Sequence, residues 1–63
     1  MNFTIKEGIQ KGLISFSEDE KTITYIHQNK SRNFTNPEEK VQAEAFVLLV
    51  TQYNYTPERI KTQ

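Results

Sequence analysis

The strongest structural signal in this sequence is the start of a helix at Asn36 and Pro37. Asparagine is a favoured N-cap, because its side-chain oxygen accepts a hydrogen bond from a free backbone N–H of the first turn. Proline suits the first helical position, where no N–H is needed. Glu39 completes a capping-box pattern with Asn36, and Glu38 adds negative charge at the positive end of the helix dipole. These residues predict a helix with Asn36 as its N-cap and Pro37 as its first helical residue.

An apolar stripe at helical spacing follows this start and continues to residue 53. We expect its central line to be Val41, Ala45, Leu48 and Gln52, with Phe46, Leu49, Val50 and Tyr53 beside it. The run 45–50 is apolar almost all round, which indicates that the helix is covered on more than one side. The helix is therefore the predicted core element.

The rest of the chain has to supply the apolar surface that packs on this helix. The sequence has 63 residues, enough for one small domain, and chains of this size bury only about 60% of their unfolded surface. It contains no cysteine, so neither a disulfide nor a thiolate–metal site stabilises it. The stability must come from packing the N-terminal half against the long helix.

Residues 4–11 have the pattern of a short helix. Thr4 is placed as its N-cap, Ile5 and Ile9 share one face, and Gly12 suits the left-handed residue that ends a helix. Such a short helix is not stable alone, and we expect its apolar face to dock on the long helix.

The next two segments, residues 13–17 and 22–27, alternate apolar and polar side chains around the polar tetrad 18–21. This pattern predicts a β-hairpin with one face on the core. The inward side chains should be Ile14, Phe16, Ile23 and Tyr25. The acidic tetrad is interpreted as a solvated turn, because Ca²⁺ loops need ligands at defined alternating positions.

The remaining segments complete the expected topology. Residues 28–35 are polar and lack periodicity, which predicts a connection into the long helix. Thr56 and Pro57 repeat the cap chemistry and predict a helical turn that continues to Ile60. The predicted fold class is α+β, with a short N-terminal helix, a β-hairpin, one long amphipathic helix packed on it and a short C-terminal helical turn, in a single domain of residues 1–63.

Charge and hydropathy limit the classes of partner. The chain has 8 Lys and Arg residues against 8 Asp and Glu residues, so it is not a polycation of the kind that binds nucleic acid through overall charge. Lys30, Arg32 and Lys40 are the candidate DNA-contacting residues, and they predict weak binding at most. No segment approaches the roughly 20 apolar residues of a membrane span, so we expect a cytoplasmic protein.

The residues alone predict no metal site. His27 is the only histidine, and without a second histidine or a cysteine beside it a structural role is favoured over a ligand or general base.

A motif in the second half of the chain resembles a known family. Its residues are Pro37, Glu38, Glu39, Val41, the apolar run 46–50, Tyr55, Pro57 and Ile60. Together with the segment GLISF and the residues from 24 onward, they look like the N-terminal region of type I restriction enzyme R subunits and of related DNA restriction and N6-adenine methylase proteins. The resemblance implies a Mg²⁺-dependent nuclease of the PD-(D/E)xK type. In that family the first helix contributes a carboxylate at the edge of the metal site, and the matching residue here is Glu38.

The sequence also departs from the family pattern. Gln42 stands where the family usually has an arginine, and the family's metal-binding Asp and Glu-x-Lys lie on strands that follow this region. Asp19 with Glu38 and Lys40 gives a formal match, which we reject because the last two lie on a helical turn and point in different directions. The ordinary role of Glu38, as a charge at a helix start, remains the alternative to metal binding.

Two functions follow as hypotheses. The first is an N-terminal segment of a restriction enzyme, inactive alone, with the other parts of that enzyme and possible weak contact with DNA as partners. Mg²⁺ would then be the cofactor of the whole enzyme, and this chain would hold no cofactor itself. The second is a free-standing protein-interaction module that docks through exposed parts of the stripe in residues 46–53.

Overall fold

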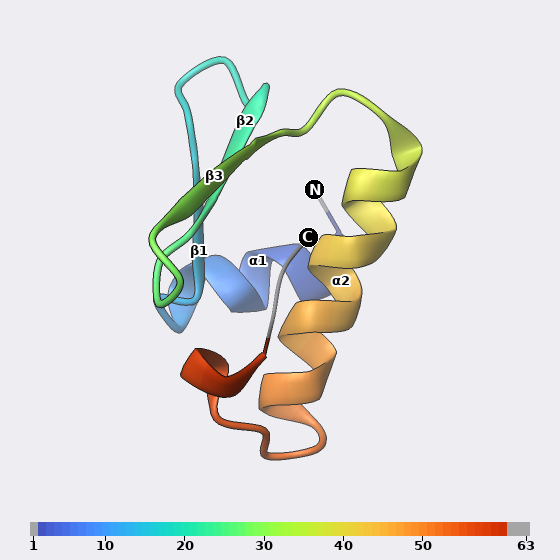
Figure 1. The fold of residues 1–63 in the computed structure, drawn as a ribbon. Helices are drawn as coiled ribbons and strands as arrows, with labels where there is room; N and C mark the ends of the chain where they lie inside the picture. Colours follow the sequence, from blue (N-terminus) through green and yellow to red (C-terminus); the bar gives the residue numbers. More distant parts are fainter. Residues whose placement is uncertain (1, 61–63) are drawn as a thin grey trace.

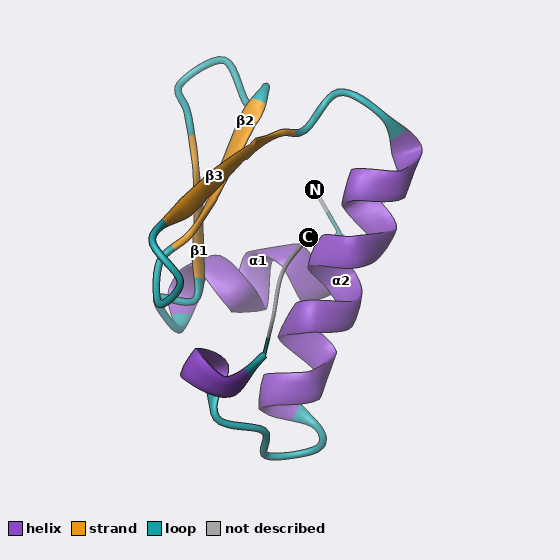
Figure 2. Ribbon diagram, in the orientation of Figure 1, coloured by secondary structure: helices purple, strands orange, loops and turns teal. Residues whose placement is uncertain are grey.

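The computed structural model describes residues 2–60, which form the α+β fold that the sequence predicts (Figures 1 and 2). The elements follow the order α1 (Phe3–Gln10), β1 (Ile14–Phe16), β2 (Thr22–Tyr25), β3 (Lys30–Asn33), α2 (Pro37–Thr51) and the 3-10 turn η1 (Pro57–Arg59). The strands form one layer, α2 lies across from it, and α1 packs against both α2 and β1 (Figure 1).

The sheet has three antiparallel strands in the order β1-β2-β3, one more than predicted. Strand β3 lies within residues 28–35, which the sequence analysis treated as a connection, and that prediction was wrong for Lys30–Asn33. The strand lacks apolar alternation, and it forms because a tight turn with Asn29 in the left-handed region returns the chain along β2. On the outer face, the hydroxyl groups of Thr24 and Ser31 are 2.9 Å apart and share a hydrogen bond across the two strands.

Helix α1 begins at Phe3, and its N-cap lies two residues before the predicted cap, Thr4. Its N-cap is Asn2, whose side-chain oxygen accepts a hydrogen bond from the Ile5 N–H at 2.9 Å, so Thr4 is not the cap. The inward face is formed by Ile5 and Gly8, and the predicted partner Ile9 is 41% exposed. Gly12 adopts the left-handed conformation expected after a helix, with φ of 72°.

The core lies between the sheet, α1 and α2. Its buried apolar side chains are Ile5, Leu13, Ile14, Ile23, Tyr25, Ala43, Phe46 and Val47. The inward side chains predicted for the two hairpin strands are confirmed, with Phe16 partly buried against this cluster. An edge-to-face aromatic pair joins the sheet to α2, Tyr25 with Phe46 at 5.2 Å between ring centroids. A second such pair joins Phe16 of β1 to Phe34, which follows β3, at 4.8 Å.

Helix α2 begins at Pro37 as predicted, but a different face is buried. Val41 and Leu48, on the predicted central line, are 66% and 40% exposed, whereas Ala43, Phe46 and Val47 are buried. Because the run 45–50 is apolar almost all round, its period does not select one side. The choice is made by tertiary contacts, since Phe46 packs on Tyr25 and Val47 packs beside Gly8 of α1.

The C-terminal turn returns to the core after an irregular segment. Pro57 takes the first position of η1 as predicted, while the Thr56 side chain makes no cap hydrogen bond. The side chain of Ile60 packs against the core cluster. None of the helices within residues 2–60 is long and apolar enough to span a membrane.

Candidate functional site

The first turn of α2 holds the carboxylate that the family resemblance singles out. The side-chain oxygen of Asn36 accepts a hydrogen bond from the Glu39 N–H at 3.0 Å, which fixes where the helix starts. From this start, Glu38 is exposed on the first turn, whereas Glu39 is half-buried with its Oε2 atom buried. Glu39 lies seven residues before Phe46, so it shares the face that α2 turns toward the sheet. The helix-start carboxylate that enters the protein interior is therefore Glu39.

The three predicted DNA-contacting cations have different environments. Lys30 and Arg32 lie two residues apart on one face of β3, where they pair with Tyr25 and Ile23 of β2, and this face is directed at α2. The Nε atom of Arg32 is buried, whereas Lys30 and Lys40 are exposed. The guanidinium of Arg32 is thus partly directed into the protein, away from the surface on which Lys30 and Lys40 could contact DNA.

Four polar side chains meet at the interface between the sheet and α2, and we call them the inner polar cluster. They are Tyr25 from β2, Arg32 from β3, and Glu39 and Gln42 from α2. Each has a buried polar atom without a hydrogen-bond partner among the described residues: Tyr25 Oη, Arg32 Nε, Glu39 Oε2 and Gln42 Nε2. The cluster adjoins the core, because the Tyr25 ring packs on Phe46.

The pKa of the Tyr25 hydroxyl responds to the other three side chains of the cluster. Burial raises the pKa of the Tyr25 hydroxyl, and the Glu39 carboxylate raises it further, because a nearby negative charge opposes ionisation. The Arg32 guanidinium and the Gln42 amide act in the opposite direction on the same pKa. The hydroxyl therefore keeps its proton at neutral pH.

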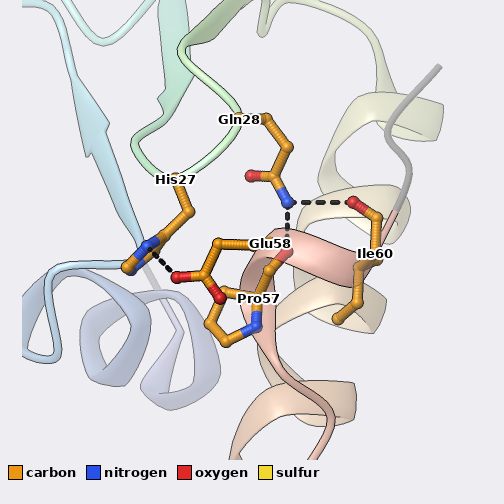
Figure 3. A network of polar contacts seen from close by, with 5 residues as sticks. All are labelled: His27, Gln28, Pro57, Glu58 and Ile60. Carbon is orange, nitrogen blue, oxygen red and sulfur yellow. Dashed lines mark hydrogen bonds and ion pairs between the residues drawn. The ribbon is translucent and has the colours of Figure 1, made fainter.

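A second polar group links the β2–β3 turn to the C-terminal turn (Figure 3). The Nδ1 atom of His27 lies 3.0 Å from a carboxylate oxygen of Glu58. The amide nitrogen of Gln28 donates to the carbonyl oxygens of Pro57 and Ile60, the latter at 2.9 Å. His27 and Gln28 thus hold η1 against the turn that precedes β3, which gives His27 a structural role.

The acidic tetrad forms an exposed turn between β1 and β2. The carboxylate of Asp19 accepts hydrogen bonds from the Ser17 hydroxyl at 2.6 Å and the Lys21 N–H at 3.0 Å. The first of these bonds, aided by the second, holds the pKa of the Asp19 carboxyl below its ordinary value. Glu20 completes the turn in the left-handed region, with φ of 61°. Local backbone geometry accounts for this carboxylate.

Among residues 2–60, no three His, Cys, Asp or Glu side chains gather into a group that could hold a metal ion. Comparison of the chain with protein-family models, with curated proteins and with solved structures found no match.

The inner polar cluster as a unit was not predicted from the sequence. A signal for half of it was present, because Glu39 and Gln42 precede Phe46 by seven and four residues and so share one helical face. The other half depended on β3, whose register alone places Arg32 on the inner face of the sheet.

Proposed function

We propose that this chain is the N-terminal segment of a cytoplasmic restriction enzyme similar to the type I R subunits, and that it does not cleave DNA by itself. The proposal is supported by the motif that begins at Pro37 and ends at Ile60. The observation that carries it is that both halves of this motif belong to one packed unit. Pro37 starts the helix that covers the sheet, and Ile60 returns to the same core.

The links around η1 support the proposal further. Gln28 donates to the carbonyl groups of Pro57 and Ile60, and the ion pair of His27 with Glu58 lies beside it. These contacts hold the end of the motif at a fixed place on the fold. A segment that leads into a nuclease domain needs such a fixed exit, because metal-assisted cleavage requires its parts to be positioned within a fraction of an ångström.

Within this proposal Glu38 is the residue matched to a carboxylate at the edge of the family's metal site. Its exposure on the first turn of α2 leaves the side chain accessible to another part of the enzyme. Mg²⁺ prefers several oxygen ligands in octahedral geometry, and one helix-start carboxylate does not provide them. The metal would therefore be held chiefly by the Asp and Glu-x-Lys strands of the remaining enzyme. DNA contact by Lys30, Arg32 and Lys40 would be weak and would fall with salt.

The test begins with the coding DNA on the 3′ side of this chain. We expect one continuous reading frame with strand-forming segments that bear Asp and Glu-x-Lys. The purified product of that frame should nick supercoiled plasmid in Mg²⁺, while residues 1–63 alone should not. Glu38→Ala in the long product should abolish nicking, and Glu18→Ala, a matched change in the exposed β1–β2 turn, should not. A stop codon after residue 63 with no nuclease gene beside it would contradict the proposal.

One observation favours the second candidate, a protein-interaction module. Val41, Ala45 and Leu48 lie three or four residues apart on α2, and all three are exposed. Such a line of apolar side chains is the pattern by which a helix docks on another surface. If the module is free-standing, Leu48→Gln should weaken binding to its partner protein, with no change in a plasmid assay of any neighbouring gene product.

A further inference from the structure

We propose that the outer edge of β3 is a docking site for an extended acidic segment of a partner protein, which adds to the sheet as a fourth strand. Strand β3 comes last in the sheet order β1-β2-β3, so it pairs with β2 on one edge and with no strand of residues 2–60 on the other. At the other end of the sheet, β1 packs against α1 (Figure 1). An open edge strand is a template for pairing with another chain.

The register of β3 shows which backbone groups this edge offers. Phe34 donates its N–H to the Lys21 carbonyl at 2.7 Å, and hydrogen-bonded positions alternate along an antiparallel pair. Ser31 and Asn33 therefore turn their N–H and C=O groups away from β2. The hydroxyl contact between Ser31 and Thr24 agrees with this register, because side chains lie closest at positions that exchange no backbone hydrogen bonds.

Two donors and two acceptors in alternation match the backbone of an extended peptide. The phosphates of a nucleic acid match them worse, because phosphate oxygens only accept hydrogen bonds and would leave the carbonyl groups of Ser31 and Asn33 without a donor. The backbone of this edge therefore favours a peptide over DNA.

The charge around the edge selects an acidic peptide. Residues 22–37, which include β2 and β3, contain Lys30 and Arg32 and no Asp or Glu. Lys30 is exposed and Arg32 is partly exposed. Since the two lie on one face of β3, acidic side chains two residues apart on an added strand would lie beside them. At the other end of the sheet, β1 leads into the acidic turn 18–20, which would repel the same segment.

A second copy of this chain does not supply the added strand. Its acidic residues 18–20 are held in a turn, because the Asp19 carboxylate accepts hydrogen bonds from Ser17 and Lys21. Pairing of β3 with another β3 would bring the cations of the two copies together. Cations on an edge strand also prevent such pairing between copies, and if that were their whole role, an acidic peptide would not bind.

The first test uses a labelled peptide of sequence Thr-Glu-Val-Glu-Val-Thr in a fluorescence-anisotropy titration of the whole chain. It should bind, and more weakly as salt is added. The matched peptide with lysine in place of both glutamates should bind about tenfold more weakly, because two ion pairs become repulsions. Lys30→Glu should reduce this preference, whereas Lys6→Glu, the same charge change on an exposed residue of α1, should not. Thermal unfolding of both variants checks that they fold.

A second test locates the peptide on the protein. In NMR spectra of the ¹⁵N-labelled chain, the acidic peptide should slow hydrogen exchange of the Ser31 and Asn33 amides, which point away from β2. The same peptide with N-methylated backbone amides should not bind, since it lacks the donors that pair with the edge. Equal binding of the acidic and basic peptides, signal changes confined to α2, or protection of these two amides by duplex DNA but not by the acidic peptide would each overturn the proposal.

Discussion

Gly8→Ala gives the sharpest test of how closely α1 packs on α2. A Cβ atom built at Gly8 would lie 2.6 Å from Val47 Cγ2, 3.1 Å from Ile14 Cδ1 and 3.2 Å from Ile14 Cγ1. Carbon atoms in good contact are about 3.5–4.0 Å apart, so the contact with Val47 is about 1 Å too short. Val47 and Ile14 are almost fully buried and have no free space to enter. Valine in a helix also has one strongly preferred rotamer, which prevents Val47 from turning away.

Two opposing effects determine the result. Alanine favours a helix interior over glycine by about 0.8–1.0 kcal/mol. Overpacking a filled core typically costs about 1–3 kcal/mol. The packing cost is the larger effect, so Gly8→Ala should destabilise the domain by about 1 kcal/mol and lower its melting temperature by about 4–8 °C in thermal unfolding followed by circular dichroism.

The control variant removes the obstructing atom. Val47→Ala deletes Cγ2, and in that background the penalty of Gly8→Ala should shrink by about 0.5 kcal/mol or more, a coupling expected only for side chains in contact. Sucrose, which stabilises folded states, keeps the weakened double variant folded during the measurement. Gly12→Ala should show no such coupling, because a Cβ at Gly12 meets nothing within 4 Å. An unchanged or higher melting temperature for Gly8→Ala in the otherwise wild-type chain would refute the close helix contact.

Three further outcomes follow from the structure. Asn36→Ala should lower the free energy of unfolding by about 1 kcal/mol in a urea melt, because it removes the hydrogen bond to the Glu39 N–H. Phe46→Ala should lower the free energy of unfolding by about 3–5 kcal/mol and leave much of the chain unfolded at 25 °C, since it removes a buried ring from the core. A smaller loss of stability than for Asn36→Ala would contradict the burial of this face of α2. Burial raises the folded-state pKa of Tyr25 above its ordinary value of about 10. The stability contributed by the neutral hydroxyl is therefore present below pH 10 and is lost as pH rises through the folded-state pKa. Tyr25→Phe should reduce this alkaline loss of stability in a series of thermal melts.

The elements that the sequence predicted well have local causes. The start of α2 depends on Asn36 and Pro37, whose side chains act on neighbouring backbone groups. The inward side chains of β1 and β2 follow from the alternation of apolar and polar residues within each strand. The end of α1 depends on the conformational freedom of Gly12. In each case the relevant physics acts within a few residues.

The features that were missed depend on contacts between distant residues. Strand β3 is polar, and it exists because β2 offers hydrogen bonds and the Asn29 turn brings the chain back. The buried face of α2 is selected by Tyr25 and Gly8, which lie far away in the sequence. The inner polar cluster required both facts at once. Arg32 faces inward only in the register of β3, and Glu39 faces the sheet only when the correct face of α2 is buried.

The motif that resembles restriction enzymes contains residues of two kinds, those that the fold uses and those that are exposed. Pro37, Phe46 and Ile60 are explained by folding, because they start the helix or pack on the core. Glu38 and Val41 are exposed, and neither side chain packs on the core. They lie three residues apart, so they share one side of the helix, and under the proposed function this side would contact another part of the enzyme.

Val41→Ser tests this separation between folding and function. Val41 is 66% exposed, so the substitution should change the free energy of unfolding by no more than about 0.5 kcal/mol, as is usual for surface positions. In the product of the longer reading frame proposed above, the same change should reduce Mg²⁺-dependent plasmid nicking, because it alters the surface that carries Glu38. Glu18→Ala serves again as the surface control. A large loss of stability in Val41→Ser would show that this side of α2 is covered within the domain, and unchanged nicking at unchanged stability would remove Val41 from the functional surface.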